Sequence, residues 1–359
     1  MEALARIFGR NRSEVSDDDK PEDESMSSAD IQPVATDSPS ALTRNDPPWV
    51  ELVNIYVDQT GSEASHAQAL ESLVQMICGD DGVKFLQLVQ SMDSHLNSTD
   101  ITVRARGTIL LAEVVSSIPD DKAANSSALA AFFAARLSDW PSVRGALKGL
   151  LCLLRREANA TKLNLDTVSP TISALLKKVH VQSHPQPDRQ LCFEVLLRVM
   201  QTFPSACAAL GPEFPDRLIS AVDGEKDPRC LLLAFQLWQA LPLVFQPAAR
   251  SGGGGDLRHL EEHAEELCDV MACYFPIVFT APPGDKRGVT REMLQQGLKG
   301  AFTSTPVFTE HVLALILSKL GAAADPPPST AVIVDSLDML SGCIDAYGAE
   351  TMLPHISAV

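Results

Sequence analysis

The chain has 359 residues, with 46 acidic against 29 basic side chains and a formal net charge of −17, so it lacks the basic excess that binding to nucleic acid or to an anionic membrane requires. The acidic balance favours basic protein partners, or simply solubility. Apolar residues make up 45% of the chain and aromatic residues 5%, and leucine and alanine supply most of the apolar content, which favours helices over sheets.

Residues 1–48 are predicted to form a disordered acidic tail, because they carry 11 acidic and 5 basic side chains and almost no apolar periodicity. The N-terminus shows no apolar core of a secretory signal. The longest apolar run, Cys230–Phe245, is interrupted by two glutamines and a proline, and we expect it to be too short to span a bilayer. Eight scattered cysteines without a Cys-x-x-Cys pair are typical of a reducing compartment. We therefore expect a soluble intracellular protein.

From Trp49 onward, apolar segments alternate with turn residues and repeat at a regular interval. Four turn signatures end in an arginine, at positions 104, 144, 189 and 229, so the successive separations are 40, 45 and 40 residues. These signatures are Thr102-Val103-Arg104, Ser142-Val143-Arg144, Pro187-Asp188-Arg189 and Asp227-Pro228-Arg229. A period of about 40–47 residues is that of HEAT and armadillo arrays.

The apolar residues after each arginine share one helical phase. After the first three arginines they follow the i, i+3, i+4, i+7 spacing of one buried helix face, and after Arg229 the stripe is displaced by one residue. We therefore predict an all-α solenoid of stacked antiparallel helix pairs of the HEAT type. The charged turn residues can bond to exposed backbone groups or to the next turn, and we expect them to form a ladder along one edge. The predicted ladder residues are Arg104, Arg144, Asp188, Arg189, Asp227 and Arg229.

Further helices are predicted beyond this region. Residues 292–300 and 310–320 are interpreted as one helix pair, and 332–346 as the start of another after a run of three prolines. A flexible Gly-rich insertion over about 247–256 precedes a helix that starts near Asp256. No polar capping helix precedes Val359, so we expect the repeat domain, residues 49–359, to be a fragment of a longer array.

One motif has the pattern of a zinc protease. His259, Glu262 and His263 match the H-x-x-E-H pattern, in which two histidines bind zinc and the glutamate activates water. The same segment carries an apolar helical stripe that places the three residues on its solvent flank, and no third ligand follows, so we predict neither metal nor cofactor here. His180 and His184 share the spacing, but the prolines beside them predict a surface turn. The cysteines lack the close spacing of iron–sulfur ligands and are predicted to be packed thiols.

Four stretches carry a resemblance to a known family. They are Ala221–Leu232, with Asp223, Gly224, Glu225 and Lys226; Cys273–Pro283, with Tyr274, Phe275 and Pro276; Val289–Leu294; and Ser304–Phe308. These stretches are similar to those of the methyl-methanesulfonate-sensitivity protein nineteen family of HEAT-repeat proteins in DNA repair and transcription. The resemblance covers residues 49–359 and corresponds to that family's N-terminal domain, while the acidic tail and the Gly-rich insertion are departures from it.

The resemblance implies a non-enzymatic adaptor of the cytosolic iron–sulfur assembly targeting complex, located in the cytoplasm and the nucleus. Such an adaptor binds apo-client enzymes, including DNA helicases and polymerases, together with other subunits of the complex, and holds no cluster itself. Two alternatives stay open. One is a transport-type solenoid that binds basic cargo, although Trp49, Trp140 and Trp238 are isolated and form no regular groove pattern. The other is the zinc protease. Partner contacts, the role of the tail and the oligomeric state do not follow from the sequence.

Overall fold

The computed structural model describes residues 47–79, 84–122, 126–156, 165–245, 257–281, 288–321 and 327–356, and every regular element within them is a helix. The predicted all-α fold is therefore confirmed. The predicted acidic tail and the Gly-rich insertion lie outside the described residues, apart from Pro47 and Pro48. The chain divides into two compact units, residues 1–124 and 125–359.

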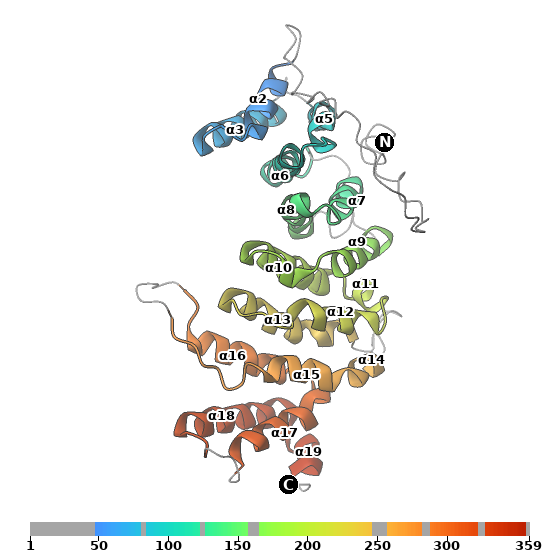
Figure 1. Cartoon of the computed structure of the whole chain (residues 1–359). Helices are drawn as coiled ribbons and strands as arrows, with labels where there is room; N and C mark the ends of the chain where they lie inside the picture. Colours follow the sequence, from blue (N-terminus) through green and yellow to red (C-terminus); the bar gives the residue numbers. More distant parts are fainter. Residues whose placement is uncertain are drawn as a thin grey trace, which may run out of the picture. The chain divides into compact units, whose positions relative to one another are not determined.

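The first unit contains α2 (Pro48–Val57), α3 (Glu63–Cys78), α4 (Phe85–Ser91), α5 (Asp93–Leu96) and α6 (Ile101–Ser117), drawn in blue to teal in Figure 1. Helix α6 packs against α2, α3 and α5. It begins where the Asp100 side chain accepts hydrogen bonds from the backbone N–H groups of Thr102 and Val103, a standard N-cap.

The second unit is built from helix pairs that stack in two rows (Figure 1). One row, here the B row, contains α8 (Val143–Arg155), α10 (Gln186–Thr202), α13 (Pro228–Phe245), α16 (Arg291–Phe302) and α18 (Thr330–Tyr347). The other, the A row, contains α7 (Ser126–Arg136), α9 (Leu165–Lys178), α11 (Pro204–Ala208) with α12 (Glu213–Val222), α14 (Leu257–Glu262) with α15 (Ala264–Ala272), α17 (Thr309–Leu320) and α19 (Ala349–Ile356). Because neighbours within a row pack on one another, no helix pair has to bury its apolar face alone.

The predicted apolar stripes form the core of each unit, the first stripe on α6 in the first unit and the other three in the B row of the second unit. All of their members are buried except Phe203, which is half-buried at the end of α10. The buried members are Gly107, Leu110, Leu111, Val114, Val115 and Ile118; Leu147, Leu150, Leu151 and Leu154; Cys192, Val195, Leu196, Val199 and Met200; and Leu231, Ala234, Phe235, Trp238 and Leu241.

Helix α13 is long and apolar enough to cross a membrane by length and composition alone, although its sequence was expected to be too short for this. Its apolar character has another explanation, because Phe235 and Trp238 are fully buried and the helix packs between α10 and α16. The indole N–H of Trp238 also donates to the carbonyl oxygen of Leu267 on α15 at 3.0 Å, which joins the two rows. Helix α16 and the segment Pro306–Leu320, which are bent by 95° relative to each other, reach that length and apolar character only if they are counted as one span.

One predicted helix pairing is wrong. Residues 292–300 and 310–320 were expected to form one hairpin, but α16 packs mainly on α13 in the B row, whereas α17 pairs with α18. The reason is the long connection between α15 and α16. Because residues 273–290 separate these two helices, the sequence pattern does not show that they form a pair. Helix α17 thus starts a new pair, after a short 3₁₀ turn at Pro306–Phe308.

Candidate functional site

Ion pairs link successive turns of the second unit along the edge where each A-row helix turns into its B-row partner. The first joins Arg144, at the start of α8, to Asp188, at the start of α10, with 2.5 Å between Nε and Oδ1. The Asp188 carboxylate is mostly buried. Because one partner comes from each repeat, the pair fixes the register of the two helices.

The second link is a forked ion pair between Arg189 and Glu225. Arg189 Nε donates to Glu225 Oε2 and Nη2 donates to Oε1, both at 2.8 Å, and the arginine also donates to the carbonyl oxygen of His184 at 3.0 Å. The Glu225 side chain is 0% exposed. Burial alone raises its pKa, but the hydrogen bonds from Arg189 and from the backbone N–H groups of Asp227 and Lys226 outweigh this and lower the pKa below its ordinary value.

The two longest signature stretches of the sequence meet at Glu225. Asp223 ends α12, and Gly224 adopts a φ of +80°, a left-handed conformation that glycine adopts without a steric penalty and that turns Glu225 inward. From the other stretch, the hydroxyl of Tyr274 donates to the backbone carbonyl oxygen of Glu225 at 2.9 Å. Phe275, one residue later, is buried. The two stretches are therefore joined, and we call Asp223–Lys226 together with Tyr274–Pro276 the turn platform.

The remaining predicted ladder residues make hydrogen bonds or ion pairs within their own turns. Arg104 donates to the carbonyl oxygen of Ser98 in its own turn at 2.7 Å. Asp227 caps α13 by accepting from the backbone N–H groups of Arg229 and Cys230. Within the described residues, the Arg229 side chain pairs only with Asp227, at 3.9 Å, and is 67% exposed.

A further rung was missed by the sequence reasoning. Arg291, at the start of α16, pairs with Asp335 on α18 at 2.6 Å between Nη2 and Oδ2, and its Nε donates to the carbonyl oxygen of Ile277 at 3.0 Å. Gln295 donates to the other Asp335 oxygen at 2.9 Å, and Lys299 pairs with Asp338 at 2.9 Å. Arg291 stands 62 residues after position 229, outside the 40–45 residue period, because the connection before it is long. Its Val-Thr-Arg context was the signal that could have revealed it.

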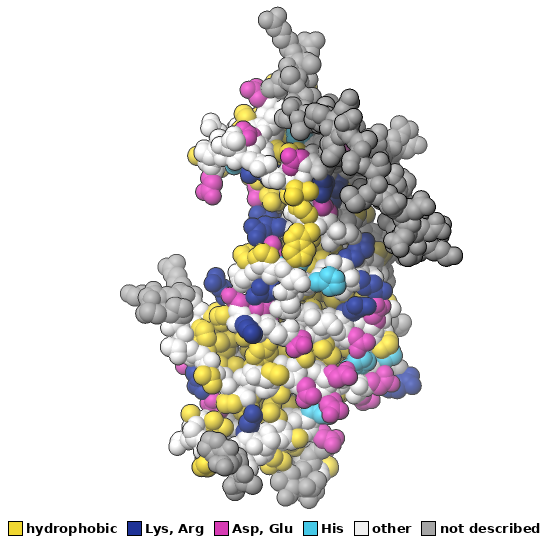
Figure 2. Space-filling view, in the orientation of Figure 1, with side chains coloured by type: hydrophobic (Ala, Val, Ile, Leu, Met, Phe, Trp, Pro, Cys, Tyr) yellow, Lys and Arg dark blue, Asp and Glu magenta, His cyan; other side chains and the backbone are white. Residues whose placement is uncertain are grey.

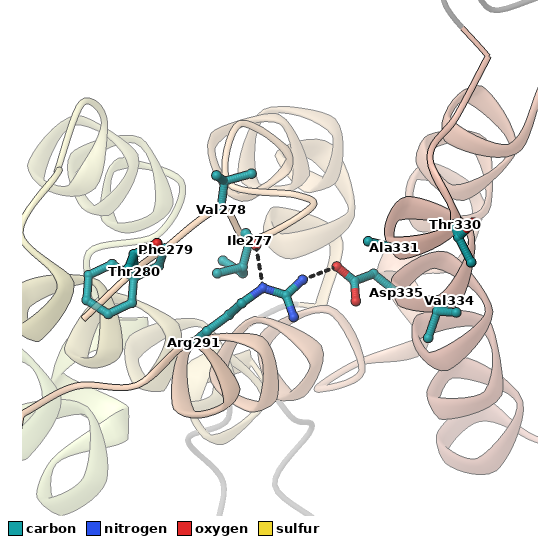
Figure 3. A pocket seen from close by; sticks show the side chains of 9 residues that line it. All are labelled: Ile277, Val278, Phe279, Thr280, Arg291, Thr330, Ala331, Val334 and Asp335. Carbon is teal, nitrogen blue, oxygen red and sulfur yellow. Dashed lines mark hydrogen bonds and ion pairs between the residues drawn. The ribbon is translucent and has the colours of Figure 1, made fainter.

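Beside this rung lies a groove of about 540 Å³ (Figure 3). Its walls are the extended segment 277–280 on one side and the first turns of α18 on the other, and Arg291 with Asp335 lies between them (Figure 3). Two apolar side chains on its rim are exposed to an unusual degree, Val278 at 95% and Val334 at 57%. The groove thus combines an apolar rim with a charge pair that is already satisfied internally.

The same edge carries an exposed aromatic residue. Trp140, in the turn before α8, is 56% exposed and stacks on the ring of His184 at 3.9 Å between centroids and 17° between planes. His184 is therefore buried, and the prediction that it lies on the surface is wrong, although the predicted turn exists as the 3₁₀ helix Val181–Ser183. Burial lowers the pKa of His184. His180 is exposed, as expected.

A family model described as "Dos2-interacting transcription regulator of RNA-Pol-II", MMS19_N, matches residues 89–359, which include every ion pair of the ladder from Arg144–Asp188 to Arg291–Asp335. The chain belongs to the MMS19 family. Curated relatives named "MMS19 nucleotide excision repair protein homolog" include one from Arabidopsis thaliana, 32% identical over 86% of this chain, and one from Homo sapiens, 32% identical over 74% of it. A relative of the same name from Dictyostelium discoideum is 26% identical over 87% of the chain.

The chain spans about a quarter of the length of the MMS19 relatives it matches, with 26% of the Arabidopsis protein and 24% of the human protein covered. Among solved structures, an engineered protein aligns with 86% of this chain and 71% of its own at a TM-score of 0.46 and 11% identity, a likeness too low to carry an inference. The resemblance noted in the sequence is thus confirmed at the level of the family.

The H-x-x-E-H pattern of this MMS19-family chain does not form a zinc-protease site. The helix breaks at His263, which separates α14 from α15. His263 turns its Nε2 to Asp216 on α12 at 2.9 Å, whereas His259 lies beside Glu262 at 3.6 Å between Nδ1 and Oε2. The three residues therefore do not converge on one point, and the geometry gives the motif no proteolytic centre.

Most of the cysteines are packed in the interior, as predicted. Five are buried: Cys192, Cys207, Cys230, Cys268 and Cys343. Burial raises the pKa of Cys207 and Cys230 to about 12 and that of Cys343 to about 11, so these groups remain protonated thiols at neutral pH. Metal ligation needs the thiolate form.

Proposed function

We propose that this chain acts as a non-enzymatic adaptor that binds apo-client proteins for cytosolic iron–sulfur cluster insertion, and so supports DNA repair, replication and transcription. Membership of the MMS19 family supports the link to repair and transcription, because its relatives are named as nucleotide excision repair homologues and its family model as a transcription regulator. The finer assignment to iron–sulfur assembly rests on the resemblance of the signature stretches. Its clients would be iron–sulfur helicases and polymerases, with other subunits of the targeting complex as neighbours.

The observation that carries a binding role is the ladder edge of the second unit. Ion pairs hold its turns in register, and apolar side chains stand on this rigid edge with 56–95% of their surface exposed, namely Trp140, Val278 and Val334. Exposed aromatic and aliphatic side chains on a rigid surface are the usual anchors of protein interfaces. The groove next to Val278 provides a concave apolar wall for one partner side chain.

The chemistry of the edge supports a scaffold. Around the groove, the charged side chains Arg291 and Asp335 neutralise each other, and the other polar side chains are the hydroxyls of Thr280 and Thr330. A general base or a nucleophile needs an activating partner, and the described groove residues provide none.

The adaptor role also requires the protein in both the cytoplasm and the nucleus. Fractionation of cells, with detection by antibody, tests this location directly.

The proposal is tested by binding of the full chain to a purified apo iron–sulfur helicase. The variant Val278→Asp with Val334→Asp places two charges on the groove rim, and we expect it to weaken binding at least about tenfold, since a buried unpaired charge costs more than 1.4 kcal/mol. The control variant Leu353→Asp changes a side chain that is 62% exposed on α19, outside the groove, and should bind like the wild type. Equal affinities for all three proteins, or no binding by the wild type, would contradict the proposal.

A further inference from the structure

The break between α14 and α15 directs one histidine ring across to the neighbouring repeat. His263 occupies the break with φ −108° and ψ 8°, and its side chain is 13% exposed. Its Nδ1 lies 2.7 Å from the carbonyl oxygen of His259. Because a carbonyl oxygen can only accept, Nδ1 carries the hydrogen of this bond. The hydrogen bond from Nδ1 therefore fixes the orientation of the ring, and Nε2 faces α12.

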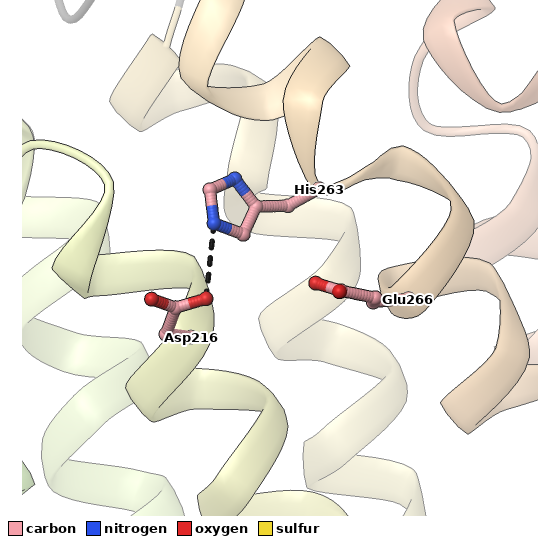
Figure 4. Close-up of side chains that lie close together, drawn as sticks. All are labelled: Asp216, His263 and Glu266. Atoms are coloured by element: carbon pink, nitrogen blue, oxygen red, sulfur yellow. Dashed lines mark ion pairs between the residues drawn. The ribbon is translucent and has the colours of Figure 1, made fainter.

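Two carboxylates from different helices lie close to the His263 ring. Asp216 on α12 places Oδ1 2.9 Å from His263 Nε2, and Glu266, in the first turn of α15, completes a group whose three ligand atoms lie within 4.8 Å of one another. In Figure 4 the dashed line joins the His263 ring to Asp216, and the Glu266 carboxylate lies nearby. The arrangement joins two consecutive A-row repeats.

The charges around this group are unbalanced. Within the described residues, no lysine or arginine pairs with Asp216 or Glu266, and the nearby Lys177 and Arg217 pair with Glu213 instead. Further exposed acidic side chains stand on α14 and α15, and Figure 2 shows acidic side chains gathered over α12, α14 and α15. They are Glu261, Glu262, Glu265 and Asp269. Such a field favours a cation at the point where the three ligand atoms meet.

We propose that Asp216, His263 and Glu266 form a binding site for a divalent transition metal of the zinc type, which joins α12 to α15. One imidazole nitrogen with two carboxylate oxygens is a donor set that zinc accepts, whereas magnesium and calcium prefer oxygen alone. Zinc ligands in tetrahedral geometry lie roughly 3.4 Å apart, so zinc binding requires the three ligand atoms to adjust from their present positions within 4.8 Å of one another. An Nδ1–H bonded to a backbone carbonyl is the usual support behind a metal-binding histidine.

This site is distinct from the one that the sequence pattern suggests. The H-x-x-E-H pattern would combine His263 with His259 and Glu262 from one helix, but the helix break removes both from the convergence point. The ligands instead come from consecutive repeats. A metal held there would stabilise the stacking of the A row, which is a structural role and leaves the proposed adaptor function independent of it.

The test is a calorimetric titration of the chelator-treated full chain with ZnCl₂ and, separately, with MgCl₂. We expect one equivalent of zinc to bind, with magnesium at least about tenfold weaker. Asp216→Asn and Glu266→Gln should each weaken zinc binding at least about tenfold, by analogy with the loss of supporting groups at known sites. The matched control Glu265→Gln removes a neighbouring exposed carboxylate and should leave the affinity unchanged. Circular dichroism verifies that each variant is folded.

Several results would overturn the proposal. Equal weakening by Glu265→Gln and Glu266→Gln would mean that zinc associates with the acidic surface as a whole. A thiolate charge-transfer band on titration with CoCl₂ would mean that the exposed Cys78 or Cys273 binds the metal instead. Absence of zinc binding by the wild type would refute the proposed site. A cobalt spectrum without that band, lost in Asp216→Asn, supports it.

Discussion

Replacing Arg189 with alanine removes one partner of the buried ion pair at the centre of the turn platform. The Glu225 carboxylate, 0% exposed, would then lose two hydrogen bonds of 2.8 Å and keep only those from the backbone N–H groups of Lys226 and Asp227. Leaving a buried charge without its partner costs about 3–5 kcal/mol. Because the two backbone bonds remain, we expect a loss near the lower end, about 3 kcal/mol.

Arg229→Ala is the matched control, since Arg229 occupies the equivalent position of the next turn but is 67% exposed and 3.9 Å from its partner Asp227. An exposed pair of this kind contributes about 0.2–1 kcal/mol. Urea unfolding measures both losses, and hydrogen exchange at the amides of Lys226 and Asp227 shows whether the platform opens locally, as repeat arrays can unfold in parts. Losses for the two variants that agree within about 0.5 kcal/mol would refute the reasoning.

Three further predictions concern pH, packing and thiol reactivity. Because the folded pKa of Glu225 is lowered, the stability that its pair with Arg189 provides is fully present above the unfolded value and is lost as the pH falls through the folded pKa. The difference in unfolding free energy between wild type and Arg189→Ala should therefore shrink on acidification, and a difference independent of pH would contradict this. Gly297→Ala should destabilise by about 1–3 kcal/mol, because its Cβ would lie 2.8 Å from a buried phenylalanine ring on α13. Urea unfolding should show less than about 0.5 kcal/mol for the exposed Gln296→Ala. The Cys207 thiol, with a pKa of about 12, should resist iodoacetamide at pH 8 until the protein unfolds, and mass spectrometry showing rapid labelling of the native protein would disprove its burial.

The fold was predictable because its signals are periodic and local. The stripe of Leu147, Leu150, Leu151 and Leu154 follows from helical spacing alone, and its burial needs only a neighbour of similar pattern. The pairing of α16 and α17 was not predictable in the same way. The long connection between α15 and α16 shifts the apparent repeat period. As a result α17, the first helix of the next pair, stands closer to α16 in sequence than α15, the partner of α16.

The site was predictable only in part, because residues in equivalent sequence contexts make different contacts in the fold. Arg189 and Arg229 have equivalent sequence contexts, yet only Arg189 finds a buried carboxylate one repeat away. The partner, Glu225, is placed by the left-handed conformation of Gly224, which a sequence pattern permits but does not require. The convergence of His263 with Asp216 depends on a helix break that no proline or glycine marks.

The most direct test of the adaptor account uses a photo-crosslinking amino acid at position 278 of the full chain in cells, with the same residue at position 353 as the control. Both positions are exposed, at 95% and 62%, but only Val278 borders the groove on the ladder edge. The account predicts crosslinks from position 278 to iron–sulfur helicases or polymerases in excess over position 353. Equal crosslinking from both positions, or crosslinks from position 278 only to proteins without a cluster, would contradict it.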